Sequence, residues 1–405
     1  MEFKEIKEEV FREFLDQYPL RTFLQTPEIG RVRGRSGWTI DYVGVYREET
    51  LVAATMLLSL PRHLGRLEFY APRGLLIDYD DHSLLSFFVS ELKSYIKKRK
   101  GFVLRIDPYV VLQERDINGD VVEGGEDHRD VVLYLEQLGF RKKTKTEQAG
   151  LTFVLDLEGK SEEDIQKGMR SNTRNIIRRT MKTGIHLREL TKDQLPEFKQ
   201  IMVATCERKQ FQGRKLSYYQ AMYEEFAPRD EIKYIIAELH LKDALHNVEQ
   251  ELRKEEEKLK NLKDTKHTKK ERPELELNCQ NLKKRLEELK NLQAEKGDII
   301  PLSGSMFVLY QPEIVYLSSG NYAEYMKYYA QYLIQWEMIR YGIEHHYRRY
   351  NFYGIIEYRD KKHKDYGIYD FKKGFNGCVE ELIGEFELPI DGFYSFFQLL
   401  HKIKK

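Results

Sequence analysis

Two adjacent lysines, Lys372 and Lys373, lie between aromatic residues in the stretch IYDFKKGFNG, which covers residues 368–377 of the 405-residue chain. A positioned amine could stabilise a negative charge that develops during a reaction. The same pair could also form a solvated turn. The stretch by itself leaves both interpretations open, so the other polar motifs have to be compared with it.

A basic segment, GMRSNTRNIIRRTMK, covers residues 168–182 and suggests a second kind of chemistry. Arg170, Arg174 and Arg178 recur at helical spacing, which predicts that they share one face of a helix, and Lys182 follows them. Such a face could bind phosphate groups. Basic runs are more often plain solvated helix surface, and that interpretation remains open.

A third candidate is the segment ERKQFQGRKLSYY, residues 207–219. Gly213 allows a loop to close between two helices. Arg214 and Tyr218, four residues apart, could then converge on an anion, because arginine binds phosphate in a bidentate manner and tyrosine adds a directed hydroxyl. An ordinary loop between helices is the alternative.

A fourth candidate is the segment YAPRGLLIDYDD, residues 70–81, which is predicted to join a strand to a helix. Asp80 or Asp81 has the side chain and position of a helix N-cap. Asp78, just before that cap, could orient or deprotonate an amine.

Several familiar catalytic motifs are absent from the sequence. It contains no H-E-x-x-H, G-x-S-x-G or Walker loop, and no metal site is predicted. The cysteines, Cys206, Cys279 and Cys378, are far apart, which argues against a disulfide framework or a zinc ribbon. The segment RVRGRS, residues 31–36, is close to an acyl-CoA pyrophosphate loop. It ends in serine and precedes a predicted strand, which weakens an acyl-CoA assignment.

Composition favours a globular protein with more than one domain. Hydrophobic residues make up 41% of the chain, and 67 basic side chains nearly balance 66 acidic ones. The length predicts roughly two or three domains. No apolar run approaches the ~18 residues of a membrane span, and the N-terminal segment lacks a signal-peptide pattern. We therefore expect a cytoplasmic, soluble protein, with peripheral contact to the inner face of the membrane left open.

Hydrophobic periodicity predicts two α/β units on either side of residue 150. In the first unit, strands are expected at 38–47, 50–60, 66–71 and 101–108, and a helix at 82–100. In the second, strands are expected at 151–157, 234–241, 303–310, 314–320 and 347–355, and helices near 161–183, 192–210 and 322–342.

Residues 241–297 interrupt the second unit with a sequence rich in Glu, Lys and Leu. Its apolar positions follow heptad spacing in two stretches, which are separated by the polar segment DTKHTKKERPE, residues 264–274. This pattern predicts an antiparallel coiled-coil hairpin with a short turn containing proline. A solvated strut, a dimerisation arm and a partner-binding arm are all compatible with it.

The order of these motifs resembles the Fem family of tRNA-dependent peptidoglycan aminoacyltransferases. Matching pieces are FLQTPEIGRVR, YAPRGLLIDYDD, VLRIDP, TRNIIRRTMKTGI, ERKQFQGRKLSYY, the helical hairpin, LSGSMFVLY, YLSSGNY, QWEMIRYGI, YNFYGI and YDFKKGFNG. The resemblance implies two domains like GCN5-related N-acyltransferases, with mixed sheets and an inserted hairpin. The first would cover 1–150, with 384–405 packed back on it; the second, 151–240 and 298–383.

The resemblance also implies a reaction and its partners. An amino acid, Gly, Ala or Ser, would move from aminoacyl-tRNA to the stem-peptide lysine, or to a growing bridge, of lipid II or a UDP-linked muropeptide. No cofactor would be needed. Neither the amino acid, the form of the acceptor nor the oligomeric state follows from the sequence.

Site residues are implied where the local motifs match. Lys372 corresponds to a lysine of the catalytic region, and Asp78 to a carboxylate proposed as base. Arg33, Arg214 and Tyr218 correspond to substrate-binding positions, and Ser318 replaces a tyrosine found in several relatives. The basic segment with Arg170, Arg174, Arg178 and Lys182 would face tRNA phosphates.

Two alternatives remain open at this stage. The chain could be an acyl-CoA-dependent N-acyltransferase, against which the poor pyrophosphate loop counts. It could also be a non-catalytic protein that binds tRNA or a protein partner through its coiled-coil arm.

Overall fold

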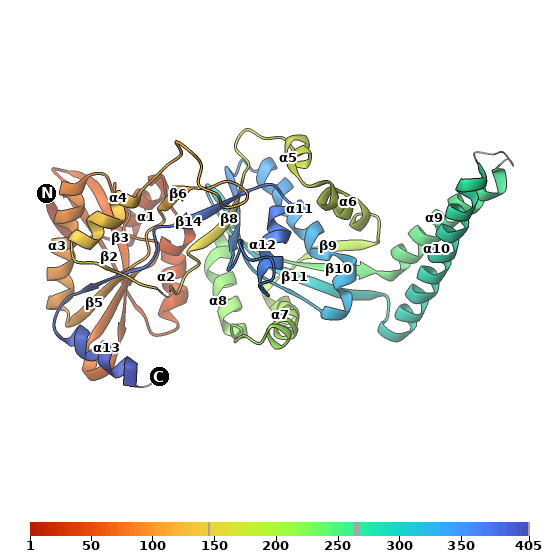
Figure 1. Cartoon of the computed structure of the whole chain (residues 1–405). Helices are drawn as coiled ribbons and strands as arrows, with labels where there is room; N and C mark the ends of the chain where they lie inside the picture. Colours follow the sequence, from red (N-terminus) through yellow and green to blue (C-terminus); the bar gives the residue numbers. More distant parts are fainter. Residues whose placement is uncertain (145, 263–267, 404–405) are drawn as a thin grey trace.

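The computed structural model describes residues 1–144, 146–262 and 268–403. Two α/β lobes lie next to each other, and a long helical hairpin projects from the second lobe (Figure 1). One lobe is built on a seven-stranded sheet and the other on an eight-stranded sheet. The predicted fold class, α/β with two mixed sheets and an inserted hairpin, is confirmed.

The first sheet has the strand order β1-β2-β3-β4-β5-β15-β7. Its strands are β1 (Glu2–Glu5), β2 (Thr39–Arg47), β3 (Thr50–Pro61), β4 (Leu67–Ala71), β5 (Gly101–Ile106), β15 (Phe386–Pro389) and β7 (Arg141–Lys142). The helices of this lobe are α1 (Glu8–Gln17), α2 (Pro27–Gly34), α3 (His82–Lys98), α4 (Arg129–Gln137) and α13 (Phe393–Ile403). Strands β4 and β5 run parallel because α3 provides the crossover between them.

The second sheet has the order β6-β14-β8-β13-β12-β11-β10-β9. Its strands are β6 (Val111–Glu114), β14 (Cys378–Leu382), β8 (Leu151–Asp156), β13 (Arg349–Gly354), β12 (Glu313–Asn321), β11 (Ile299–Tyr310), β10 (Ile232–His240) and β9 (Ile185–Glu189). The helices are α5 (Glu162–Gly168), α6 (Ser171–Thr180), α7 (Leu195–Lys209), α8 (Leu216–Phe226), α11 (Ala330–Glu344) and α12 (Tyr366–Lys373). Strands β12 and β13 are parallel.

Each sheet includes a strand from a distant part of the sequence. Strand β15 pairs with β5, so the C-terminal segment completes the first sheet. Strand β6, which lies before residue 150, pairs with β14 in the second sheet. We therefore propose the domain limits given above with one change: residues 111–114 belong to the second domain.

The helix predicted near 161–183 is divided into α5 and α6. Met169 and Arg170 have extended backbone conformations and separate the two helices. Arg170 is consequently the N-cap residue of α6, whereas Arg174 and Arg178 lie within that helix. The expectation of one continuous helix that carries all these side chains was wrong.

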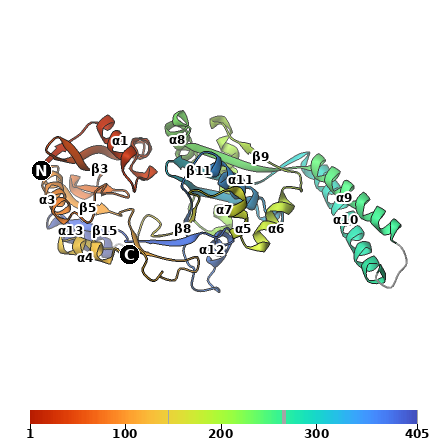
Figure 2. The same cartoon turned by 90° about the horizontal axis from the view of Figure 1, so that it is seen from above.

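The predicted antiparallel hairpin is present as α9 (Leu241–Asn261) and α10 (Thr268–Lys296), which lie side by side in both views (Figures 1 and 2). Its apolar seam includes the buried side chains of Val248, Leu275, Cys279 and Leu289. Pro273 lies inside α10 and not in the turn. Residues 264–267 of the predicted turn lie outside the described residues.

One apolar core crosses the junction of the lobes. Phe11, Leu24 and Met56 of the first lobe belong to the same buried cluster as Phe198 and Met222 of the second. This shared core fixes α2 against α8 and brings polar residues of both lobes together. Among the described helices, none is long and apolar enough to cross a membrane.

Candidate active site

A group of polar side chains gathers at the junction of the lobes, and we call it the Tyr353 cluster: Arg33, Arg73, Asp107, Tyr218 and Tyr353. Tyr353 interacts electrostatically with each of the other members. They come from separate elements, because Arg33 lies in α2, Tyr218 in α8 and Tyr353 in β13, while Arg73 and Asp107 follow β4 and β5. The cluster therefore exists only when both lobes are assembled.

Arg73 and Asp107 form the buried base of the cluster. Asp107 Oδ1 accepts a hydrogen bond from the Arg73 backbone N–H at 2.8 Å, and Asp107 Oδ2 lies 3.4 Å from Arg73 Nη1. Burial raises the pKa of Asp107 to about 6, and the nearby Arg73 charge opposes that rise. Asp107 is thus a buried carboxyl group with a raised pKa.

Neither of these residues was singled out from the sequence, although a signal existed. Arg73 follows the strand predicted at 66–71, and Asp107 lies near the end of the one predicted at 101–108, in the motifs YAPRG and VLRIDP. Strands β4 and β5 are parallel neighbours, with Ala71 opposite Ile106, so residues just beyond their carboxyl ends meet at one sheet edge. The missing step was to recognise that the two strands are adjacent.

The backbone at the cluster adopts an uncommon conformation in two places. Tyr353 has a φ of 61° and Arg73 a φ of 54°, both in the left-handed region that bulky residues seldom occupy. Such positions persist where surrounding interactions hold them, and they concentrate at functional sites. In Tyr353 the hydroxyl donates to Gln148 Oε1 at 3.1 Å, and the backbone N–H donates to Asn351 Oδ1 at 2.7 Å.

Lys372 holds the backbone at Tyr353 in place through hydrogen bonds. Its side chain in α12 is only 4% exposed, and Nζ donates to the carbonyl oxygens of Tyr353 at 3.1 Å and Gly354 at 2.6 Å. Burial lowers the pKa of Lys372 to about 7. Lys373, in contrast, donates to Asn118 Oδ1 at 2.5 Å and is half-buried, so it is not the freely solvated residue of a turn.

The outer side of the cluster carries the predicted acceptor-binding residues. The exposed guanidinium of Arg214 lies over the ring of Tyr218, 5.2 Å from its centroid. Burial raises the pKa of Tyr218, and the charges of Arg214 and Arg33 oppose this rise. The structure therefore brings Arg33, Arg214 and Tyr218 together, although the chain separates Arg33 from the other two.

A family model, "FemAB family", matches residues 6–402. The chain belongs to the FemAB family. This confirms the family indicated by the motifs. Aminoacyltransferase FemA of Staphylococcus epidermidis is 31% identical over 423 residues, covering 100% of both chains. Aminoacyltransferase FemA of Staphylococcus aureus is 30% identical over 418 residues, covering 100% of this chain and 99% of that protein.

A solved structure, the crystal structure of FemX, has the same fold. It superposes with a TM-score of 0.79 at 22% sequence identity and covers 98% of this chain and 99% of its own. The chain described here therefore shares the overall fold of FemX.

Asp78 does not take part in the Tyr353 cluster of this FemAB protein. Its side chain is exposed, and Oδ1 accepts a hydrogen bond from the Asp80 N–H at 3.0 Å. Asp81 is the N-cap of α3, because Oδ1 accepts from the Leu84 N–H at 2.9 Å. Among the described residues, Asp78 interacts with Asp80, Asp81 and Tyr18 and with no member of the cluster.

The basic segment is used in different ways along its length. Arg170 pairs with Asp370 at 2.8 Å. Arg174 Nη1 donates to three backbone carbonyls at the end of α5, those of Gln166, Lys167 and Met169. The side chains of Arg178 and Lys182 are exposed. Arg170 and Arg174 therefore already have protein partners, and Arg178 and Lys182 face solvent.

A cavity of about 410 Å³ lies between α6 and the base of the hairpin. Its lining includes the basic residues Arg179, Lys284, Arg285 and Lys327, with Glu288 as its acidic residue. It contains no member of the Tyr353 cluster. We choose the Tyr353 cluster as the candidate active site because of the side chains that it brings together, and not because of the size of a cavity. The basic lining of the cavity suits an anion.

Proposed function

We propose that this chain transfers an amino acid from aminoacyl-tRNA to the lysine amine of a peptidoglycan stem peptide, or to a growing bridge on it. The acceptor would be lipid II or a UDP-linked muropeptide. Membership of the FemAB family and the name aminoacyltransferase FemA carried by its relatives support this reaction. The observation that carries the proposal here is the Tyr353 cluster, which joins a titratable carboxyl to cations at the junction of the lobes.

The transfer reaction requires the kinds of groups that the Tyr353 cluster contains, a carboxyl group and cations. A lysine amine, with a pKa of ~10.4, must lose a proton before it attacks the ester. Asp107 is the carboxyl group within the cluster, and above a pH of about 6 it is ionised and able to take up that proton. The attack also builds negative charge on the ester oxygen, which nearby cations stabilise. Asp78 stays a second candidate base, separated from the cluster.

Arg33, Arg214 and Tyr218 are proposed to bind the phosphate-bearing acceptor. Arg214 is exposed, and Arg33 is half-buried, so both guanidinium groups are at the open side of the cluster. Bidentate arginine contacts would hold the pyrophosphate that lipid II and UDP-linked precursors share. We expect Arg214→Ala to raise the KM for the acceptor about tenfold with little change in kcat. Arg129→Ala, which replaces an exposed arginine of α4 that pairs with Asp127, should leave both unchanged.

Lys372 is proposed to act as a positioning residue. Its amine donates hydrogen bonds to the backbone carbonyls of Tyr353 and Gly354. It therefore holds Tyr353, the residue with a left-handed backbone conformation that interacts with all other members of the cluster. The sequence suggested instead that this amine contacts the tRNA end or the developing charge. That contact would require Lys372 Nζ to exchange its carbonyl partners for substrate.

The tRNA is proposed to bind across α6 and the base of the hairpin. Arg178 and Lys182 offer exposed cations within and just after α6, and the cavity between α6 and α10 adds the basic side chains of Arg179, Lys284 and Arg285. The opposite charges of phosphate and protein would make this binding depend steeply on salt. Arg170 and Arg174 would contribute less, because their guanidinium groups have partners within the protein.

The test is to supply the purified chain with a panel of charged tRNAs and with lipid II or a UDP-linked muropeptide, and to weigh the acceptor by mass spectrometry. We expect an increase equal to one amino acid residue with one of the donors. An acyl-CoA donor serves as the control for the alternative reaction. Acyl transfer from CoA, with no transfer from any charged tRNA, would overturn the proposal.

A further inference from the structure

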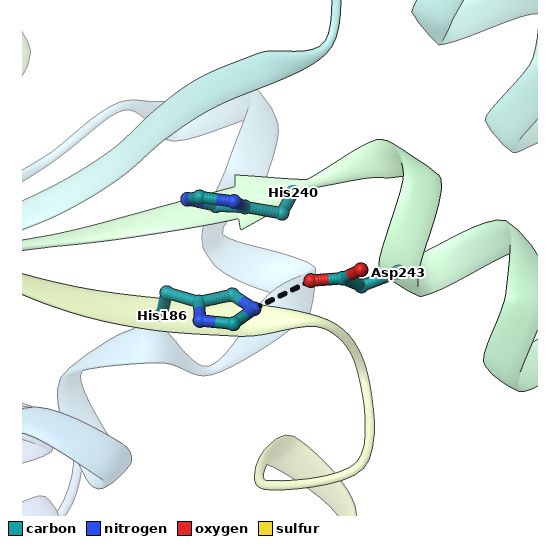
Figure 3. Close-up of side chains that lie close together, drawn as sticks. All are labelled: His186, His240 and Asp243. Carbon is teal, nitrogen blue, oxygen red and sulfur yellow. Dashed lines mark hydrogen bonds and ion pairs between the residues drawn. The ribbon is translucent and has the colours of Figure 1, made fainter.

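Three side chains of metal-binding types meet where the hairpin leaves the second lobe. His186 lies in β9, His240 is the last residue of β10, and Asp243 is in the first turn of α9 (Figure 3). One possible ligand atom from each residue lies within 4.8 Å of those of the other two. His186 Nε2 is 2.7 Å from Asp243 Oδ2, and the imidazole rings have centroids 4.2 Å apart.

The strand register explains why these residues meet. In the antiparallel pair of β9 and β10, His186 lies opposite Glu238, so His240, two residues further along, projects from the same face of the sheet. Helix α9 begins at Leu241, immediately after β10. Its first turn therefore brings Asp243 beside the two histidines, as Figure 3 shows.

The close approach of strand and helix at this point depends on a glycine. Gly184, just before β9, has a φ of +79°, in the left-handed region that favours glycine, and a side chain there would bring its Cβ within 2.6 Å of the Ala244 backbone nitrogen. The His240 N–H donates to the Gly184 carbonyl at 2.9 Å. The backbone that carries the three side chains is thus held together before any ligand binds.

We propose that His186, His240 and Asp243 bind a divalent transition-metal ion, for which zinc is a suitable probe. Two imidazole nitrogens and one carboxylate oxygen form a common ligand set for zinc. Bonds of about 2.0–2.2 Å to such atoms require ligand separations of roughly 3.3 Å. Rotation of the side chains can close the present distances, because the side chains of His186 and Asp243 are each 53% exposed and that of His240 is 30% exposed.

The surrounding charges favour a cation at this position. Glu238 Oε2 lies 3.7 Å from His240 Nε2 and adds a second carboxylate beside the three ligands. The nearby cation, Arg188, is paired with both Glu238 and Glu197 at 2.6 Å. A simple surface ion pair between His186 and Asp243, worth about 0–1 kcal/mol, would account for their contact without involving His240, whereas a bound metal ion would use all three side chains.

A metal ion bound here would connect β9 directly to the first turn of α9. Since α9 continues into the hairpin, the ion would fix the direction in which the hairpin leaves the lobe. This inference rests on the three side chains and their elements, and it does not depend on the proposed aminoacyl transfer.

Isothermal titration of the intact, metal-free chain with zinc chloride tests the site. We expect one zinc ion per chain, and we expect H186Q and H240Q each to weaken its binding at least tenfold. His82→Gln is the matched control, because His82 is also an exposed histidine next to an aspartate, at the start of α3. Zinc binding that is the same in H186Q, H240Q and the unchanged protein would overturn the proposal.

Hydrogen exchange provides a second measurement that does not depend on the stoichiometry. Saturating zinc should slow exchange of the backbone amides of residues 241–247 in the unchanged chain and in H82Q, but not in H240Q. Circular dichroism of each variant without zinc shows whether it folds. Equal slowing in H240Q and in the unchanged chain would contradict the proposed site.

Discussion

At the scale of single residues, burial determines the chemistry of this protein more than residue type does. Lys372 and Lys373 are indistinguishable in the stretch IYDFKKGFNG, yet the first is buried against two carbonyls and the second bonds to Asn118. Asp78 and Asp107 show the same contrast, since the first is exposed and the second is buried beside Arg73. The sequence shows these residue types, but it does not show which of them are buried in the folded protein.

Replacement of Lys372 by methionine should lower kcat at least tenfold and leave the KM for the acceptor within about twofold. The reason is that Tyr353 and Gly354 lose the amine that holds their carbonyls, while Arg33 and Arg214 are untouched. Steady-state transfer assays would measure both constants. Lys373→Met is the control, and equal small effects of the two substitutions would contradict the positioning role.

The buried amine should also make stability depend on pH. With a pKa of about 7, folded Lys372 is neutral between pH 7 and its unfolded value of 10.5, so the unfolded state binds more protons there. The free energy of unfolding of the unchanged chain, relative to Lys372→Met, should therefore rise with pH above 7 by up to about 1.4 kcal/mol per unit. Urea unfolding between pH 6.5 and 9 measures the difference, and a flat or falling difference would contradict it.

Asp107 and Asp78 can be separated by a pH profile. Because ionised Asp107 is the proposed base, kcat/KM should rise with pH up to about 6 and then level off. Asp107→Asn should lower kcat/KM by about 100-fold and abolish that rise, whereas Asp78→Asn should change it less than twofold. The opposite result, with folding of both variants shown by circular dichroism, would assign the base to Asp78.

At the scale of elements, hydrophobic periodicity predicted most of the strands that form the two sheets, and the hairpin as well. It did not reveal α12, β14 or β15, because these elements are short and their boundaries depend on neighbours far away in the sequence. The break at Met169 and Arg170 was missed for a related reason. Helical spacing continues across it, although the backbone does not.

Because α5 and α6 are separate helices, Arg174 binds the end of α5, whereas Arg178 and Lys182 are exposed. We therefore expect these residues to differ in their effect on tRNA binding. Arg178→Ala combined with Lys182→Ala should weaken binding of charged tRNA and reduce the slope of log K against log salt by about 1–2, because two exposed phosphate contacts are removed. Filter binding between 50 and 200 mM salt measures this slope. Arg174→Ala is the control: it should lower stability, through lost bonds to α5 carbonyls, and leave the slope unchanged.

At the scale of the whole molecule, the candidate site is a product of how the lobes meet. The shared apolar core fixes α2 against α8, and only this arrangement brings Arg33 to Tyr218 and Tyr353. The motif order indicated the family, and the family match confirmed it, but contacts between residues more than a hundred positions apart could not be read from spacing. The sequence therefore indicated Arg33 and Tyr218 as site residues, whereas Arg73, Asp107 and Tyr353 joined them only in the structure.

The most direct test of the central claim is the mass of the acceptor after incubation with the chain and charged tRNA. We predict a gain of one amino acid residue, which disappears when the tRNA is deacylated beforehand and falls strongly in the Asp107→Asn variant. A folded protein that adds no residue with any charged tRNA, to either lipid II or the UDP-linked muropeptide, would contradict the account.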